Sequence, residues 1–463
     1  MSDRLVIRAD GGRGVGSGHL GRCLALAELW GTRLGPVLLV TSPSIPERWR
    51  SAYIDAGAEI SAPDSPWLEQ PTAWVVVDGY RLGDAQAAVK RAGHRLLVID
   101  DHGSAGRYLA DVVLDQNLDV EPALYRERPS GSTLLLGPRY ALVRREFRKM
   151  PPRGAPLGRA RRVVVSLGGD PPPVAEALVR DALTSPQLSD LEVDWLAGRS
   201  DVAAALAAAD MAVANGGSTC WELCALGVPA VVLELFENQI PVARSLAARG
   251  ALENAGWFED VDAAALASRL LSLATDPARR ARLSDAGGRL VDGGGPARVV
   301  ARLRADLLEV RRAVPGDARL LWEWVNDADV RASAFSRDAI PWEEHEAWLV
   351  NALQSPRTHI FVISDGATPV GQVRFEGRNG EAEVDISVAR THRGRGLGAA
   401  MLVAAVDRLF DAVPDARVVG RVRPENAASA RSFEDAGFTF DGERAGGGQM
   451  WLRYSLGRDD PAG

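Results

Sequence analysis

The stretch Asn215-Gly-Gly-Ser-Thr-Cys-Trp-Glu-Leu-Cys-Ala-Leu-Gly-Val-Pro-Ala230 carries the pattern that decides the fold. It leaves a short apolar run, passes through two glycines and a Ser-Thr pair, continues as a helical segment and ends where a new apolar run begins. This order is typical of parallel strands joined by crossover helices. Amides and hydroxyls at such a helix start can hold a pyrophosphate. Here they belong to Gly216, Gly217, Ser218 and Thr219.

The same alternation extends over most of the chain. Short apolar runs separated by amphipathic stretches fill residues 1–149, and a further set follows a linker rich in Pro, Gly and Arg. We therefore expect two Rossmann-like α/β domains, residues 1–149 and 150–312, with a ligand cleft between them. After residue 312, helical segments precede several strand-like runs, and this α+β order predicts a third domain over residues 313–463.

The composition is that of a globular protein, with 46% apolar and 25% charged residues. The net charge of -7 argues against a nucleic-acid or anionic-membrane partner, which would need a broad basic field. No secretory or membrane-spanning pattern is present, and three cysteines fit a reducing compartment, so we expect a cytoplasmic protein. Cys220 and Cys224 have no cluster of metal ligands nearby, which favours buried core thiols and no metal.

A second glycine-rich segment follows the apolar run Leu5–Ala9 and ends in Gly16-Ser-Gly18 and His19. Glycines allow a backbone to approach a ligand closely. His19 would lie in the first turn of the next helix, where the helix dipole disfavours imidazolium and keeps the ring neutral. A neutral histidine beside an anion site is a candidate general base, and a helix-capping or core histidine is the alternative.

Glu222 lies one turn into the helix that follows Ser218 and Thr219, a position from which it can reach ribose hydroxyls. A plain capped helix with a solvated glutamate would also explain the Ser and Thr. It would not explain the paired glycines, or Asn238 and Gln239 directly after the next apolar run.

Further motifs accompany these two segments. They are Ile7-Arg-Ala-Asp10, Gly16 to Arg22, Asp78-Gly-Tyr80, Asp100-Asp101, Asp115-Gln-Asn117, Leu136 to Phe147 and Leu167-Gly-Gly-Asp170. Together, over residues 1 to about 310, they resemble the UDP-sugar hydrolases of the pseudaminic acid pathway, relatives of the GT-B glycosyltransferases. Gly168-Gly-Asp170 departs from that pattern, because a Ser or Thr before the aspartate is missing.

The resemblance implies inverting cleavage of UDP from UDP-2,4-diacetamido-2,4,6-trideoxy-β-L-altropyranose, with water as the nucleophile. It implies His19 as the catalytic base and Tyr80 as a second active-site residue. Ser218, Thr219 and Glu222 would hold UDP, and Asn238 and Gln239 the sugar. A single general base is enough for this reaction, because the attacking water must lose a proton whereas UDP leaves as a stabilised anion and needs little help from an acid.

In the last third of the chain, Ala382-Glu-Val-Asp-Ile-Ser-Val388 alternates apolar and polar residues and precedes Arg393-Gly-Arg-Gly-Leu-Gly398 and a long apolar helix. Small residues at a strand-to-helix turn point their amides into one anion pocket. This turn resembles the acetyl-CoA signature of the GNAT N-acetyltransferases, and Asn426-Ala-Ala-Ser-Ala-Arg-Ser-Phe-Glu-Asp-Ala-Gly-Phe438 resembles a later helix and turn of their fold. Residues implied to hold acetyl-CoA are Val388, Arg393, Gly394, Arg395, Gly396, Leu397, Gly398 and Asn426.

Acetyl transfer requires a neutral amine and a donor to the thioester oxyanion, which the family supplies from a backbone N–H near Val388. Glu383 and Asp385 share one strand face, so a carboxylate there can take the amine proton through water. An exposed strand face is the alternative explanation of these alternating acids. Phe433 occupies the position where the family often has a tyrosine that protonates the thiolate.

The two resemblances predict one bifunctional enzyme of nonulosonic acid biosynthesis. The rear domain would acetylate the 4-amine of a UDP-linked amino sugar, and the front domains would then remove UDP. The substrates would be the UDP-sugar, acetyl-CoA and water. Two alternatives stay open: a GT-B glycosyltransferase fused to an acetyltransferase, and a non-catalytic nucleotide-sugar-binding module that serves the acetyltransferase.

Overall fold

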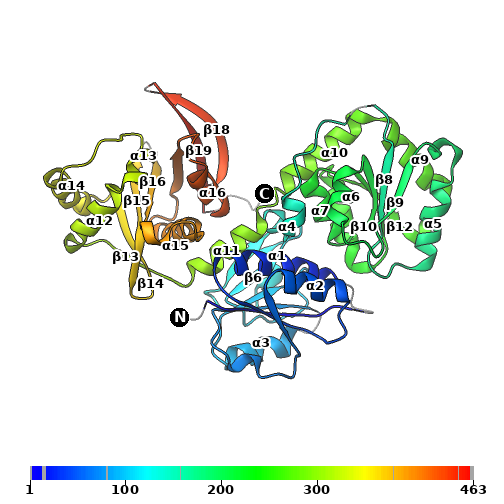
Figure 1. Cartoon of the computed structure of the whole chain (residues 1–463), viewed down its shortest axis with the longest axis horizontal. Coiled ribbons are helices and arrows are strands. Elements are labelled where there is room, and N and C mark those ends of the chain that lie inside the picture. Colours follow the sequence, from blue (N-terminus) through cyan, green and yellow to red (C-terminus); the bar gives the residue numbers. More distant parts are fainter. Residues whose placement is uncertain are drawn as a thin grey trace. The chain divides into compact units, whose positions relative to one another are not determined.

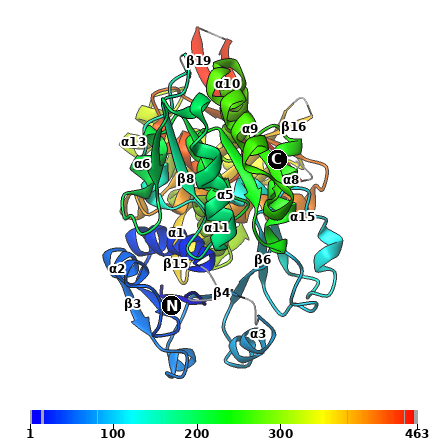
Figure 2. The ribbon, with the colours of Figure 1, turned by 90° about the vertical axis from the view of Figure 1, so that its right-hand side faces the viewer.

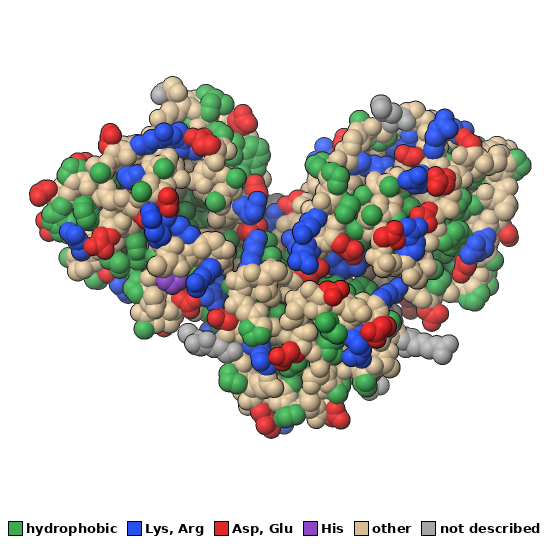
Figure 3. Space-filling view, viewed as in Figure 1, with side chains coloured by type: hydrophobic (Ala, Val, Ile, Leu, Met, Phe, Trp, Pro, Cys, Tyr) green, Lys and Arg blue, Asp and Glu red, His purple; other side chains and the backbone are tan. Residues whose placement is uncertain are grey.

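A computed structural model of the chain describes residues 3–12, 17–79, 82–156, 158–378, 380–446 and 448–458. It comprises two compact units, one that ends at Pro296 and one that begins at Ala297 (Figure 1). Acidic and basic side chains are interspersed over the face seen in Figure 3. Within the described ranges, no helix is both long enough and apolar enough to cross a membrane.

The first sheet of the N-terminal unit contains only parallel pairs among its described residues, in the order β3-β2-β1-β4-β5-β6-β7. Helices α1 and α2 cover one face and α3 the other (Figures 1 and 2). Strands β2, β4, β5 and β6 are buried over their whole length and almost entirely apolar, because both faces of the sheet are covered. The elements are β1 (Leu5–Ala9), α1 (Gly18–Arg33), β2 (Val37–Val40), α2 (Glu47–Asp55), β3 (Ala58–Ser61), β4 (Trp74–Asp78), α3 (Leu82–Arg91), β5 (Leu96–Ile99), β6 (Val112–Asp115), β7 (Thr133–Leu136) and α4 (Arg145–Arg148).

The second sheet, also parallel, has the order β12-β11-β10-β8-β9. One apolar cluster packs α6, α7 and α8 on one face, and another packs α5 and α9 on the other. The elements are β8 (Arg162–Ser166), α5 (Pro173–Leu183), β9 (Glu192–Trp195), α6 (Val202–Ala208), β10 (Met211–Asn215), α7 (Thr219–Leu226), β11 (Ala230–Glu234), α8 (Ile240–Ala248), β12 (Glu253–Trp257), α9 (Ala263–Thr275) and α10 (Pro277–Leu290). Helix α11 (Gly295–Ala305) follows and belongs to the C-terminal unit from Ala297 on.

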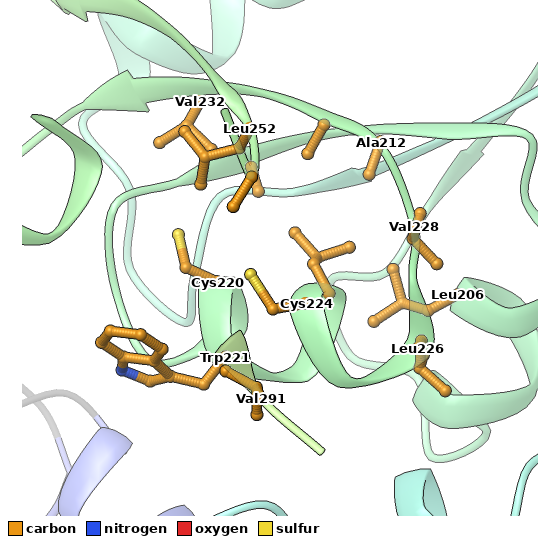
Figure 4. Close-up of a cluster of buried hydrophobic side chains, with 14 of the residues drawn as sticks. Leu206, Ala212, Cys220, Trp221, Cys224, Leu226, Val228, Val232, Leu252 and Val291 are labelled. Carbon is orange, nitrogen blue, oxygen red and sulfur yellow. The ribbon is translucent and has the colours of Figure 1, made fainter. Parts of the chain in front are cut away.

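Cys220 and Cys224 lie inside the first of these clusters, beside Val232, Leu252 and Val291 (Figure 4). Both thiols are free and buried. Burial raises the pKa of Cys224 to about 12 and that of Cys220 well above its usual value. The prediction of core thiols at these positions is confirmed.

The third sheet belongs to the C-terminal unit and has the order β13-β14-β15-β16-β17-β19-β18. Helix α15 covers one face, and α12 and α14 cover the other. Strand β13, which lies before residue 313, pairs with β14 and is therefore part of this sheet. The elements are β13 (Leu308–Arg312), α12 (Ala318–Val325), α13 (Ala328–Ser333), α14 (Trp342–Gln354), β14 (Thr358–Asp365), β15 (Thr368–Arg378), β16 (Glu381–Val388), α15 (Leu397–Ala412), β17 (Arg417–Val422), α16 (Ala427–Asp435), β18 (Thr439–Gly446) and β19 (Gln449–Gly457).

The fold class expected from the sequence is confirmed, with two parallel Rossmann-like sheets followed by an α+β domain. One irregularity of the third sheet matters for function. β16 pairs with β17, in parallel, only from Ala382 to Val384. From Asp385 to Val388 the strand pairs with β15 alone, so the sheet opens on the β17 side.

Candidate active sites

His19 and Asp78 form the centre of the first candidate site. His19 lies in the first turn of α1, which follows β1, and Asp78 is the last residue of the neighbouring strand β4. His19 Nδ1 lies 2.7 Å from Asp78 Oδ1. Because a carboxylate only accepts hydrogen bonds, Nδ1 carries the proton, and Nε2 is the atom that can take one from a substrate.

Arg22 holds Asp78 in place. Its Nε and Nη2 each donate to Asp78 at 2.7 Å, and it also forms an ion pair with Asp101. Asp78 is fully buried, which raises the pKa of a carboxyl group, but Arg22 and then His19 outweigh burial and hold the pKa of Asp78 well below its usual range. The His19–Asp78 pair therefore contains a carboxylate at neutral pH.

The start of α1 lies beside the start of α7. A Cβ added to Gly18 would lie 3.6 Å from Ser218 Oγ, so the helix that carries His19 approaches the predicted diphosphate site of the second sheet. Gly168, in the same region, has a φ of +94°, and a Cβ there would lie 2.9 Å from Asn215 Nδ2. Gly16 and Tyr80, also predicted for this site, lie outside the described residues.

The start of α7 has the character of an anion site. Ser218 and Thr219 donate no backbone hydrogen bond within the described part of the chain, so both amides are available at the positive end of the helix. Gly217 N donates to Asn215 Oδ1 at 3.3 Å. A Cβ on Gly216 would lie 2.7 Å from Gln239 O, which explains why a glycine is required there.

Gln239 packs against the glycine loop that precedes α7. Its side chain is buried, and Oε1 accepts a hydrogen bond from Leu235 N at 3.2 Å. Asn238, its neighbour, is exposed. The structure thus gives Gln239 a role in holding the loop, and contact of either residue with a sugar stays a prediction.

Arg48 and Arg144 are cations of this region to which the sequence gave no role, although Arg144 lies in the quoted segment Leu136 to Phe147. Arg48 Nη2 lies 3.4 Å from Ser17 Oγ, and a Cβ on Gly169 would lie 3.6 Å from the same nitrogen. Arg144 donates to Glu222 Oε1 through Nη2 at 2.9 Å and through Nε at 3.2 Å. Glu222, predicted to hold ribose, therefore has a protein partner on one of its two oxygens.

The turn between β16 and α15 is the second candidate site. Gly394 and Gly396 have φ values of +77° and +71°, in the left-handed region that favours glycine. Within the described ranges, no amide from Gly394 to Leu397 donates to a backbone acceptor. These amides stand at the N-terminus of a sixteen-residue helix, an arrangement suited to a diphosphate.

The Arg393 guanidinium is used within the protein. Nε donates to Val388 O at 3.0 Å, Nη1 to Asp329 at 2.8 Å and Nη2 to Asp327 at 2.8 Å. Asp327 also receives Arg390 Nε at 2.9 Å. We call Asp327, Asp329, Arg390 and Arg393 the clasp, since they join the start of α13 to the turn before α15.

Comparison with known families identifies the C-terminal unit. Residues 308–439 match the family model described as the acetyltransferase (GNAT) domain. This part of the chain is a GNAT acetyltransferase domain. The family uses acetyl-CoA as its acetyl donor, and the turn from Gly394 to Leu397 fits its diphosphate. Among the described residues, no group of three or more His, Cys, Asp or Glu is placed to hold a metal ion.

Two solved structures are similar to the GNAT domain. Aminoglycoside acetyltransferase AAC(6')-Ib in complex with coenzyme A is 18% identical, and the match covers 33% of this chain and 95% of that chain with a TM-score of 0.30. Spermidine N-acetyltransferase from Vibrio cholerae, in complex with CoA and spermine, is 22% identical with the same coverage and TM-score.

The N-terminal region is similar to two curated proteins. A UDP-N-acetylglucosamine--N-acetylmuramyl-(pentapeptide) pyrophosphoryl-undecaprenol N-acetylglucosamine transferase of Sorangium cellulosum is 36% identical over 157 residues, 31% of this chain and 37% of the relative. The spore coat polysaccharide biosynthesis protein SpsG of Bacillus subtilis is 33% identical over 141 residues, 30% of this chain and 40% of the relative. This chain thus spans less than half the length of either relative, and its N-terminal region is glycosyltransferase-like.

Glu383 and Asp385 of the GNAT domain are both ion-paired. Glu383 Oε1 accepts from Arg421 Nε at 2.7 Å, and Asp385 accepts from Arg374 Nη2 at 3.1 Å. They lie on the face opposite Val384, which packs against α15 in the core. Each carboxylate is therefore bonded to an arginine, and its role as a base stays a prediction.

Asn426 and Phe433 of the GNAT domain have structural roles. Asn426 caps α16, because its Oδ1 accepts a hydrogen bond from Ser429 N at 3.1 Å. Phe433 is buried, stacks on Tyr454 with ring centroids 5.5 Å apart, and fills the space beside Gly420. The position of the family's tyrosine thus points into the core here.

Proposed function

We propose that the N-terminal unit hydrolyses a UDP-linked sugar and that the GNAT domain acetylates an amine of that sugar. The observation that supports hydrolysis is the His19–Asp78 pair beside the start of α7. A base whose second nitrogen is fixed by a buried carboxylate, next to amides that suit a diphosphate, is what water attack on an activated sugar requires.

In the proposed reaction, water attacks the anomeric carbon as the bond from that carbon to the diphosphate oxygen breaks. His19 Nε2 takes the water proton, and Asp78 stabilises the resulting imidazolium through Nδ1–H. The amides of Ser218 and Thr219, with the Arg48 guanidinium, offset the charge that develops on UDP. Attack opposite the leaving group inverts the anomeric configuration.

In the GNAT domain, acetyl-CoA supplies the acetyl group as a thioester. The turn from Gly394 to Leu397 holds its diphosphate, and the free edge of β16 beyond Val384 offers backbone groups near the thioester. Asp385 or Glu383 takes the amine proton through water. Phe433 has no hydroxyl, so that position cannot protonate the thiolate of coenzyme A, which leaves as a stable anion.

The proposed substrate is a UDP-4-amino sugar that becomes a UDP-2,4-diacetamido-2,4,6-trideoxyhexose, as in pseudaminic acid biosynthesis. A cytoplasmic location is part of this proposal. The test is to incubate the protein with UDP-4-amino-sugar candidates, with and without acetyl-CoA, and to follow UDP release. Release that depends on acetyl-CoA supports the order acetylation, then hydrolysis; equal release without it overturns that order.

A second candidate function is transfer of the sugar to an acceptor other than water, which the similarity to the Sorangium transferase favours. The same incubation without any added acceptor distinguishes the two. Hydrolysis produces free sugar and UDP in equal amounts, whereas a transferase leaves the UDP-sugar intact.

A further inference from the structure

Arg144 belongs to the Leu136–Phe147 motif, to which neither proposed reaction gives a role. It immediately precedes α4, and its side chain points to Glu222 in the first turn of α7. Nε and Nη2 both donate to the same oxygen, Glu222 Oε1, at 3.2 and 2.9 Å. Glu222 Oε2 accepts no hydrogen bond within the described part of the chain, so one oxygen is fixed and the other is available.

The surroundings of Arg144 fix its orientation. Its guanidinium carbon lies 5.3 Å from the Trp49 ring centroid and 4.7 Å from that of Phe147, and it also forms an ion pair with Glu146. Burial opposes the charge on Arg144, but Glu222 and Glu146 outweigh it and raise the pKa of Arg144 above its usual value. The arginine is therefore a permanently charged and rigid donor.

The same packing connects Arg144 to the catalytic helix. A Cβ on Gly21 of α1 would lie 3.0 Å from the Trp49 ring, so α1 packs directly on the ring that faces Arg144. Glu28 of α1 accepts a hydrogen bond from Arg145 N at 2.7 Å. Helix α1, which carries His19 in its first turn, thus forms one continuous set of contacts with the Arg144 side chain and α7.

We propose that Arg144 is a positioning residue that fixes Glu222 so that its second carboxylate oxygen accepts the ribose hydroxyls of the nucleotide. This inference rests on the proposed binding of UDP at α7. Glu222 lies three and four residues after Thr219 and Ser218, on the same face of α7, which places its carboxylate one turn beyond the diphosphate site. Without Arg144, Glu222 would lose both its orientation and the only cation bonded to it in the described residues.

The test compares binding of UDP with that of 2′,3′-dideoxy-UDP by calorimetry on the full chain. A carboxylate that accepts ribose hydroxyls should give the wild type a preference for UDP of about tenfold or more. Glu222→Gln and Arg144→Gln should each reduce this preference to less than about threefold. Arg144→Lys keeps the charge but not the paired donors, so it should also reduce the preference, and it serves if Arg144→Gln does not fold.

The matched control is Arg249→Gln, which breaks the ion pair between Arg249 and Asp119 elsewhere in the same unit. It should leave the preference for UDP unchanged. Equal weakening of UDP and dideoxy-UDP by the Arg144 variants would show a merely structural role and overturn the inference, as would an unchanged preference. A wild type that binds neither nucleotide would instead overturn the proposed function, on which the inference rests.

Discussion

Asp78 accepts two hydrogen bonds from Arg22 and one from His19 Nδ1, all at 2.7 Å, and a longer one of 3.4 Å from Cys23 Sγ. This arrangement assigns the Nδ1–H tautomer to His19 and makes Nε2 the basic nitrogen. The tautomer depends on an acceptor at Asp78, and Arg22 guarantees that acceptor by keeping the carboxyl group ionised.

Asp78→Asn should therefore lower kcat of UDP-sugar hydrolysis by about 10²–10⁴ with little change in KM. The Asn amide would turn its oxygen to Arg22 and its NH₂ to His19, which forces Nδ1 to accept and places the proton on Nε2. The measurement is the steady-state rate of UDP release. The matched control is Asp101→Asn, which removes the other carboxylate bonded to Arg22 but leaves His19 untouched, and should cost less than about tenfold. Equal losses in the two variants would contradict the tautomer argument.

The sequence placed His19 at a helix start but gave Asp78 no role, although it lies in a quoted motif. The signal that joins them is topological. β1 and β4 are neighbours in a parallel sheet, so the residues after their carboxyl ends meet at one edge. The sequence predicts both strands but not their adjacency, because the order β3-β2-β1-β4 depends on long-range pairing that periodicity does not encode.

The clasp around Asp327 gives a prediction for the GNAT domain. Asp327 caps α13 through Asp329 N at 3.0 Å and receives Arg393 and Arg390, and its pKa is lowered to about 2: burial opposes the charge, but the two arginines outweigh it. Asp327→Asn keeps an oxygen for the cap but removes the charge. Arg393 then loses its ion pair with residue 327, and the turn before α15 is less firmly fixed. The Kd for coenzyme A should therefore rise about three- to tenfold in calorimetry.

Asp329→Asn is the control for the clasp. Asp329 is 72% exposed, and solvent screens its ion pairs with Arg390 and Arg393, so its loss should change the Kd by less than about twofold. Unchanged affinity in Asp327→Asn would show that the turn is held by its own backbone.

Arg393 shows what a sequence motif can predict and what it cannot. The signature identifies the turn, and its glycines have the backbone angles that the motif requires. The signature does not reveal that the Arg393 side chain is bonded to Val388, Asp327 and Asp329. The two aspartates precede Arg393 by more than sixty residues in the chain, so a local motif cannot show these contacts. Its predicted contact with acetyl-CoA can involve the backbone while the guanidinium serves the clasp.

Gly398 provides a prediction that separates packing from catalysis. A Cβ there would lie 2.7 Å from Ser432 Oγ and 3.3 Å from Ser432 Cβ, so Gly398→Ala should force α15 and α16 apart. We expect a lower melting temperature, equivalent to about 1–3 kcal/mol, and weaker coenzyme A binding. Adding Ser432→Ala removes the closer atom, so the double variant should regain much of the lost melting temperature and of the lost coenzyme A affinity. Thermal unfolding and calorimetry measure the two quantities. Additive losses in the double variant would contradict this account.

Asp115 leads to a prediction about pH. Tyr125 Oη lies 2.6 Å from the Asp100 carbonyl oxygen and 2.7 Å from Asp115 Oδ2. A single hydroxyl proton cannot serve both acceptors fully, and a carbonyl never donates, so a protonated Asp115 satisfies the arrangement. Burial, and then the charge of Asp101, raise the pKa of Asp115 to about 7, in agreement with this geometry.

A raised carboxyl pKa makes folding less favourable as pH rises. Between about pH 4 and 7 the unfolded chain has released the Asp115 proton while the folded chain retains it, so stability falls with pH in that window and the slope ends above it. Asp115→Asn places an NH₂ where the protonated oxygen stood, so it should keep the bond to Tyr125 without the titration. Its melting temperature should match that of the wild type near pH 5 and exceed it at pH 8, by the equivalent of about 1–3 kcal/mol. The control is Asp64→Asn, at an exposed site, which should leave the melting temperature unchanged at both pH values. An Asp115→Asn protein that is equally less stable than the wild type at pH 5 and pH 8 would show that the carboxyl group of Asp115 is ionised throughout.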